Sequence, residues 1–136
     1  MRRLAGRAAA ALSAVALSLG ASVSTAAAAG GTVTIDNTGC NGHTYCYKPS
    51  SLSITDGSRV TWNDHSGAPH DVTRCTPAAC GGLGGGNGSD NSFTSLSIGP
   101  GGSANHTFHG TGTYNYYCTI HGFNVMHGSI TVAAPK

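Results

Sequence analysis

Apolar and polar residues alternate with a period of two over much of the chain. Side chains of a β-strand point to opposite faces in turn, so this period predicts strands with one buried face. The alternating positions are rich in Thr, Val, Ile and Tyr, which fit a pleated, half-buried surface. The pattern occurs at residues 32–35, 52–55, 60–62, 93–98, 104–108, 114–117 and 129–132. Residues 71–73, directly after His70, are predicted to form a further short strand.

Glycine and proline mark turns between these segments. The turn signals stand at Asp56-Gly57, at residues 99–102 and at residues 110–112. Seven or eight short strands separated by such turns are typical of an all-β domain. We therefore predict an antiparallel β-sandwich or barrel.

The first 29 residues have the order of a signal peptide. Three arginines in the first seven residues precede a mostly apolar stretch at 8–21, and small residues at 24–29 offer cleavage sites. A membrane span needs about 20 apolar residues, so an uncleaved membrane helix is the weaker alternative. We predict an exported protein, with residues 1–29 as signal peptide and residues 30–136 as one mature domain without a membrane span.

Removal of this segment changes the charge of the chain. The full chain has a formal charge of +2, but three of its arginines lie in the signal segment. Residues 30–136 keep four Lys and Arg side chains against five Asp, which gives −1 before the histidines are counted. Binding to nucleic acid needs clustered basic side chains, so this composition argues against nucleic acid as a partner.

The chain has five cysteines, an odd number for an exported protein. Oxidising conditions favour disulfides, and with Cys118 left single the other four allow three connectivities. We favour the local pairs Cys40–Cys46 and Cys75–Cys80, because each closes a short loop. Cys118 then needs a different explanation, since an exposed free thiol outside the cell is a liability.

Residues 81–90 differ from the rest of the chain. Five of the first six residues are glycine, and Asn87-Gly88 follows. No hydrophobic period survives there, so we expect a flexible surface loop.

Two segments carry candidate metal ligands. Cys118, His121 and Met126 stand in the spacing C-x2-H-x4-M on a loop that leaves one predicted strand and enters the next. A second loop supplies Pro69-His70 upstream. A thiolate, two imidazoles and a thioether are the ligands of a trigonal copper site with a weak axial bond. Structural zinc sites instead use four strong ligands, to which a thioether adds little.

Each of these residues has an alternative interpretation. Cys118 could be a structural thiol or the unpaired partner in a dimer, and Met126 could fill the core, as Met usually does. His65 lies on the same loop as His70 and competes with it. His127 follows Met126 and, with the loop in another register, could take the axial position.

The two segments resemble the ligand loops of the cupredoxin family, and the C-x2-H-x4-M spacing is similar to the plastocyanin type. The resemblance covers residues 32–133. It implies a Greek-key β-sandwich with one type 1 (blue) copper ion at one end, held by His70, Cys118, His121 and Met126. It also implies a one-electron carrier that cycles between Cu(I) and Cu(II), without enzymatic activity, whose partners are redox proteins. We expect the mature chain to be a monomer.

The resemblance further implies roles for residues around the ion. Electrons would leave through His121, at an apolar patch formed by Ala68, Pro69, Gly122, Phe123 and Val125. The residue after the upstream histidine is usually Asn and bridges the two ligand loops, but here it is Asp71. An ionised Asp accepts hydrogen bonds and cannot donate them. We expect Asp71 to accept from the backbone near Thr119 and to lower the reduction potential.

Two other functions compete with the carrier. An exported protein could bind or deliver copper without a role in electron transfer. Multicopper oxidases and nitrite reductases also use related domains, but the sequence has no His-x-His pair for further copper ions. We therefore place the carrier first and copper delivery second.

Overall fold

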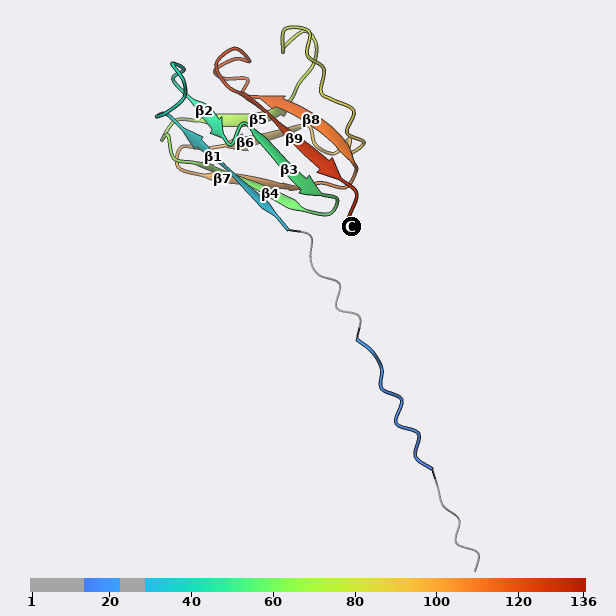
Figure 1. Ribbon diagram of the computed structural model, residues 1–136. Helices are drawn as coiled ribbons and strands as arrows, with labels where there is room; N and C mark the ends of the chain where they lie inside the picture. Colours follow the sequence, from blue (N-terminus) through green and yellow to red (C-terminus); the bar gives the residue numbers. More distant parts are fainter. Residues whose placement is uncertain (1–13, 23–28) are drawn as a thin grey trace, which may run out of the picture.

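The computed structural model describes residues 14–22 and 29–136. The predicted signal peptide therefore lies largely outside the described residues. Its described part, 14–22, forms neither strand nor helix and is exposed throughout, with Leu17 and Leu19 81% and 91% accessible. This segment extends away from the domain (Figure 1).

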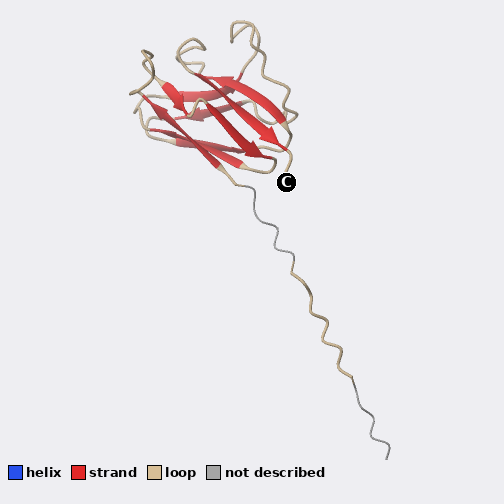
Figure 2. Ribbon diagram, viewed as in Figure 1, coloured by secondary structure: helices blue, strands red, loops and turns tan. Residues whose placement is uncertain are grey.

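Nine strands form two facing sheets, and the described residues contain no helix (Figures 1 and 2). One sheet has the order β2-β1-β4-β7 and the other the order β3-β9-β8-β5-β6. The strands are β1 (Gly31–Asp36), β2 (Cys46–Lys48), β3 (Ser51–Thr55), β4 (Arg59–Asp64), β5 (His70–Arg74), β6 (Ser95–Ile98), β7 (Ser103–Thr107), β8 (Gly112–Tyr117) and β9 (His127–Ala133).

The structure confirms the all-β sandwich and corrects two details. Nine strands are present rather than seven or eight, because β2 has only three residues and shows no alternation that could predict it. The sheets are also mixed rather than antiparallel, since β1 pairs parallel with β4 and β3 pairs parallel with β9. Alternation predicts which residues face inwards, and it carries no information about strand direction.

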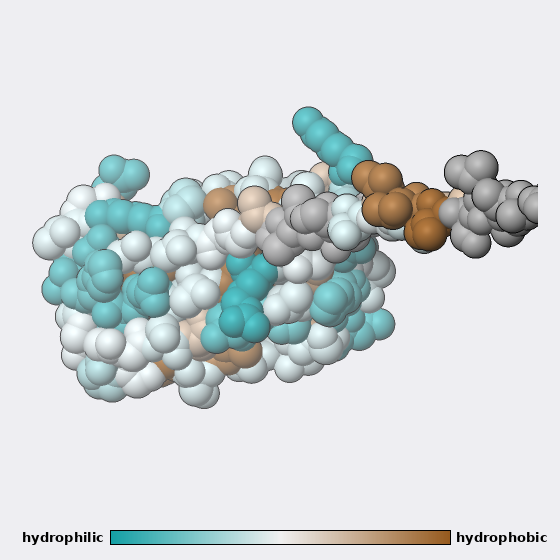
Figure 3. Space-filling view, turned by 90° about the horizontal axis from the view of Figure 1, so that it is seen from below, coloured by the Kyte–Doolittle hydropathy of each residue, from teal (hydrophilic) through white to brown (hydrophobic). Residues whose placement is uncertain are grey.

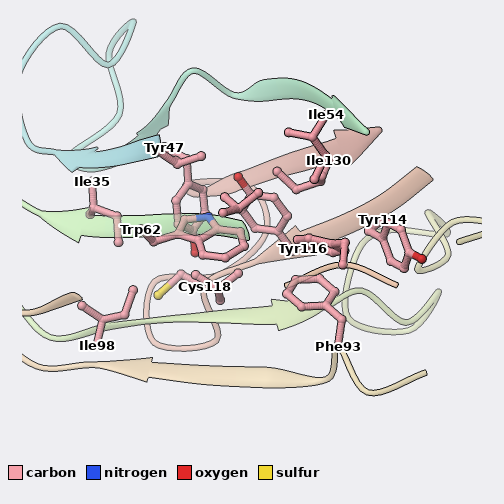
Figure 4. Packing of buried hydrophobic residues seen from close by; sticks show 14 of the residues in the cluster. Ile35, Tyr47, Ile54, Trp62, Phe93, Ile98, Tyr114, Tyr116, Cys118 and Ile130 are labelled. Atoms are coloured by element: carbon pink, nitrogen blue, oxygen red, sulfur yellow. The ribbon is translucent and has the colours of Figure 1, made fainter. Parts of the chain in front are cut away.

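Aromatic rings fill the space between the sheets (Figure 4). Trp62 lies at the centre, fully buried, with its ring perpendicular to that of Tyr116 and stacked at 6.1 Å on Phe93. Tyr47 packs edge-on against Tyr116 and reaches towards the end of the core where Cys118 lies. Each such ring removes about 150–250 Å² from water, so these few residues supply much of the driving force for folding.

The alternation in β8 and β9 continues past their ends and selects the buried residues of the loop between them. In β8, Tyr114 and Tyr116 face inwards, and Cys118 is the next residue in phase. In β9 the inward positions begin at Gly128, and Met126 is in phase with it. His127 is out of phase and exposed.

Loops gather at the end of the sandwich opposite the N-terminal segment and the C-terminus (Figure 1). Two of them are closed by disulfides, which join Cys40 to Cys46 and Cys75 to Cys80. Cys118 is the remaining cysteine, and it is free and buried. No helix among the described residues is long and apolar enough to cross a membrane.

The glycine-rich stretch is anchored to the domain rather than free. Arg74 lies beneath it and donates hydrogen bonds to the carbonyls of Gly85, Gly86, Gly88 and Asp90. The same guanidinium lies over the ring of the buried Tyr114, 4.9 Å from its centroid. The expectation of a flexible loop did not include these contacts, which depend on a residue outside the stretch.

Candidate metal centre

The loop between β8 and β9 is a short, hydrogen-bonded turn. The backbone N–H of Gly122 donates to the carbonyl of Cys118, and the N–H of Met126 donates to that of Gly122, at 2.9 and 3.0 Å. A bond of 3.1 Å from the N–H of Cys118 to the carbonyl of Met126 closes the loop. Gly122 has a φ of 87°, a conformation that favours glycine. The loop thus holds three of the candidate ligands in a fixed arrangement.

Three of the predicted ligands converge in space. The donor atoms of His70, Cys118 and His121 all lie within 4.8 Å of one another. The sulfur of Cys118 is 3.9 Å from Nδ1 of His70 and 3.4 Å from Nδ1 of His121. An ion about 2.0–2.3 Å from each atom in a trigonal arrangement would separate sulfur from nitrogen by about 3.7 Å. The spacing therefore fits a trigonal site.

The burial of these residues is unequal. Cys118 and His70 are 0% and 2% accessible, whereas His121 is partly exposed. Burial and the neighbouring His121 lower the pKa of His70 below its ordinary value of 6.5, against the opposing charges of Asp64 and Asp71. A lower pKa favours the neutral imidazole, which is the form that binds metal.

Met126 and His127 differ in where their side chains lie. Met126 is fully buried next to Cys118. His127 is exposed, its ring stacks on Phe123 at 4.4 Å, and its Nδ1 lies 2.8 Å from the carbonyl of Phe123. The ring of His127 thus points at its own loop, and Met126 is the one of the two residues whose side chain is buried. His65, the rival of His70, is also exposed.

Comparison with known proteins decides the family. Residues 33–133 match the family of copper binding proteins that includes plastocyanin and azurin. The chain belongs to this family. Its cofactor is therefore copper, and the buried cysteine, the two histidines and the adjacent methionine have the donor chemistry that such a site requires.

Individual relatives agree with this assignment. A plastocyanin from Scenedesmus fuscus is 34% identical over 86 residues, which cover 63% of this chain and 85% of that protein. A purple cupredoxin from Nitrosopumilus maritimus superposes with a TM-score of 0.57 at 26% identity, over 76% of this chain and 99% of that one. A mutant of amicyanin in its reduced Cu(I) form gives a TM-score of 0.52 at 25% identity, over 76% of this chain and 82% of that one.

Asp71 connects the two ligand loops of this cupredoxin. Its backbone N–H points at the sulfur of Cys118, 3.5 Å away, and its carboxylate accepts hydrogen bonds from the N–H and the hydroxyl of Thr119. The carboxylate also accepts from Thr73 at 2.9 Å, and its carbonyl accepts from the hydroxyl of Tyr47 at 2.5 Å. Every partner of the carboxylate is a donor, as an ionised carboxylate requires. One residue therefore fixes both loops and the core beneath them.

Tyr45 is a residue of the site that the sequence did not reveal. Its ring packs at 4.9 Å against that of His70 and at 4.4 Å against that of His121. It stands next to Cys46, so the Cys40–Cys46 disulfide holds it over both histidines. The contacts of Tyr45 with His70 and His121 join residues far apart in the chain, so no local pattern predicts them. Its position next to Cys46 was the one feature of the sequence that could have drawn attention to it.

The residues of the apolar patch that was expected around His121 are all at least partly exposed. Pro69 is exposed, and Ala68, Gly122 and Phe123 are partly so. Val125 is partly exposed as well, and it differs in that it also packs against the core. Ile120, which was not part of the predicted patch, is 54% accessible and precedes His121 in the chain, so it adds to the apolar surface expected around His121.

Proposed function

We propose that the mature chain, residues 30–136, is an exported one-electron carrier whose copper ion is held by His70, Cys118, His121 and Met126. The ion supplies reversible exchange of one electron between Cu(II) and Cu(I). The observation that carries the proposal is the single free cysteine, fully buried and 3.4–3.9 Å from two histidine nitrogens. Members of this family are typically electron carriers, which supports the role further.

Rigidity of the protein around the ion supports rapid electron transfer. The two oxidation states of copper prefer different geometries, so ligands that cannot rearrange keep the energy of reorganisation small. Here the turns of the 118–126 loop, the bonds made by Asp71 and the ring of Tyr45 restrict the ligands from three sides. The chain's own contribution is thus to hold the donor atoms still.

The uneven burial of the ligands supports a defined route for the electron. His121 is the one histidine of the cluster with an accessible edge, and Ile120 and Pro69 make its surroundings apolar. Such a surface can approach a partner protein and exclude water from the gap. We expect a redox partner to dock over His121.

Export is supported by the N-terminal segment. In its described part Val15, Leu17 and Leu19 are exposed, although a domain would normally bury such side chains. Figure 3 shows hydrophobic residues, in brown, on the segment that projects from the domain. An apolar run that packs on nothing fits a segment that the export machinery binds and a peptidase removes.

Voltammetry of the copper-loaded mature chain tests the carrier role. A carrier gives one reversible one-electron wave and keeps its copper when a chelator is present during repeated cycling. A delivery protein instead loses Cu(I) to the chelator on reduction. Copper that leaves in the first cycle would contradict the proposal and favour delivery.

A further inference from the structure

An aspartate and a serine lie behind His70, on the side away from Cys118. Nε2 of His70 is 2.7 Å from the hydroxyl of Ser66. That hydroxyl is 2.6 Å from Oδ1 of Asp64, which also accepts the backbone N–H of Ser66 at 2.8 Å. The other carboxylate oxygen accepts the N–H of Gly101 at 2.8 Å. The side chains of Asp64 and His70 are both 0% accessible.

The hydrogens of this cluster can be assigned from its donors and acceptors. An ionised carboxylate only accepts, so the single proton of the Ser66 hydroxyl points to Asp64. The hydroxyl oxygen can then only accept, and it does so from the N–H of Ala68 at 3.2 Å and from the ring of His70. Nε2 of His70 must therefore carry a hydrogen, which leaves the lone pair on Nδ1, the nitrogen that faces Cys118.

The carboxylate also brings a negative charge close to the metal ligand. Oδ1 of Asp64 is 3.8 Å from Nε2 of His70. The carboxylate of Asp64 accepts three hydrogen bonds, two from Ser66 and one from Gly101, which stabilise its ionised form. Among the described residues no Lys or Arg forms an ion pair with Asp64. The charge therefore acts on the imidazole without a counter-ion.

We propose that Asp64 and Ser66 are positioning residues of the copper site, which fix His70 as its Nε2–H tautomer and lower the reduction potential of the ion. The inference rests on the proposed function, because it takes His70 as a ligand. A negative charge near the ligand stabilises Cu(II) more than Cu(I), and hydrogen bonds to a ligating imidazole orient it and raise its basicity. The relay passes this effect from Asp64 through Ser66 to the ring.

The chain contains a second copy of the same turn that serves as a control. Asp90 accepts from the N–H and the hydroxyl of Ser92, and it lies 2.9 Å from Nε2 of His106. The backbone N–H of Asp90 donates to the hydroxyl of Tyr114, which places this turn next to Tyr114. Tyr114 precedes Cys118 by four residues of extended chain, about 13 Å. This turn is remote from the copper site.

Reduction potentials of matched variants test the proposal. Ser66→Ala removes the link and Asp64→Asn removes the charge, so both should raise the potential above that of the wild type. Ser66→Thr keeps a hydroxyl and should restore the wild-type value. Ser92→Ala and Asp90→Asn make the same changes in the control turn and should leave the potential unchanged.

A second measurement on the metal-free chain needs no copper. The hydrogen on Nε2 of His70, followed by NMR, should exchange with water roughly tenfold faster in Ser66→Ala than in the wild type or in Ser66→Thr. An unchanged exchange rate, or a potential unchanged in Ser66→Ala or Asp64→Asn, would overturn the relay. Failure of the proposed function is a separate result, because the wild type would then show no reversible copper wave.

Discussion

At the scale of single residues, two buried carboxylates lie next to the candidate copper ligands. Asp71 is 8% accessible and receives hydrogen bonds from Thr119 and Thr73, and Asp64 lies behind His70. We expect these two carboxylates, together with a thiolate at Cys118, to favour the more positive oxidation state of the ion.

Replacing Asp71 by Asn tests whether the carboxylate that bridges the two ligand loops lowers the reduction potential. The amide oxygen can still accept the N–H of Thr119, so the bridge persists while the charge is lost. We expect the reduction potential to rise. Asp36→Asn is the control, because it removes the charge of a partly exposed carboxylate that pairs with Lys48. Voltammetry of both variants separates an effect of the charge at Asp71 from an effect of the net charge of the protein. A reduction potential that is unchanged or lower in Asp71→Asn would show that the charge of Asp71 does not lower the potential.

Two buried tyrosines offer a matched pair in the core. The hydroxyl of Tyr116 is buried next to the indole of Trp62 but forms no hydrogen bond of ordinary geometry among the described residues. The hydroxyl of Tyr114 instead accepts from the N–H of Asp90 and donates to the carbonyl of Gly110. A buried polar group without a partner costs stability. We expect Tyr116→Phe to raise the free energy of unfolding by about 1 kcal/mol and Tyr114→Phe to lower it by about 2 kcal/mol. Urea unfolding measures both, and a loss in Tyr116→Phe would show a partner for its hydroxyl.

At the scale of elements, the sequence predicted the strands better than their pairing. Alternation in β8 and β9 identified the inward residues, and in both strands the phase extends to Cys118 and Met126. The three-residue β2 was missed because its disulfide and its tertiary contacts, rather than a pattern, make it a strand. Parallel pairing of β3 with β9 brings together residues far apart in the chain, which no local pattern contains.

In the glycine-rich segment, tertiary contacts determine which glycine positions could accept a side chain. A Cβ added to Gly88 would lie 2.2 Å from the ring of Tyr114, while one added to Gly84 would meet nothing within 4 Å. Both positions look equivalent in the sequence. The two positions differ only in their tertiary contacts: Gly88 lies against the buried ring of Tyr114, and its carbonyl accepts a hydrogen bond from Arg74.

These two glycines give a direct test of how the loop packs. We expect Gly88→Ala to destabilise the domain by about 3 kcal/mol, because the methyl group must displace a buried ring. Gly84→Ala should change the free energy of unfolding by less than about 0.5 kcal/mol. Equal and small effects in urea unfolding would mean that the loop does not press on Tyr114.

At the scale of the whole molecule, the spacing of one loop predicts the part of the site that is local in sequence, whereas His70 and the bridge from Asp71 to Thr119 were expected from the resemblance to the cupredoxin ligand loops. Cys118, His121 and Met126 share nine residues, so their spacing alone indicates a copper loop. The ring of Tyr45 over both histidines and the relay from Asp64 could not be predicted, since they depend on how separate loops meet at one end of the sandwich.

The stability of the whole domain should depend on pH through Asp90. Burial raises its pKa, but hydrogen bonds from Ser92, His109 and His106 outweigh burial and hold the pKa well below the ordinary 3.8. A carboxyl group whose pKa is depressed in the folded state stabilises the fold above its unfolded pKa, and this stabilisation is lost as the pH falls through the folded pKa.

Comparison of Asp90→Asn with the wild type over pH tests this linkage. We expect the metal-free variant to be less stable by about 2 kcal/mol at neutral pH and the difference to shrink as the pH falls below about 4. Urea unfolding at both pH values measures it. A difference that stays constant would assign the loss to packing rather than to the charge.

The central claim, a copper ion bound by the thiolate of Cys118, is tested most directly by the visible spectrum of the mature chain after addition of Cu(II). Charge transfer from a thiolate to Cu(II) should give strong blue absorption. That absorption should disappear in Cys118→Ser and persist in His127→Ala, whose exposed histidine lies on the same loop. A colourless Cu(II) complex of the wild type, or a blue complex of Cys118→Ser, would contradict the account.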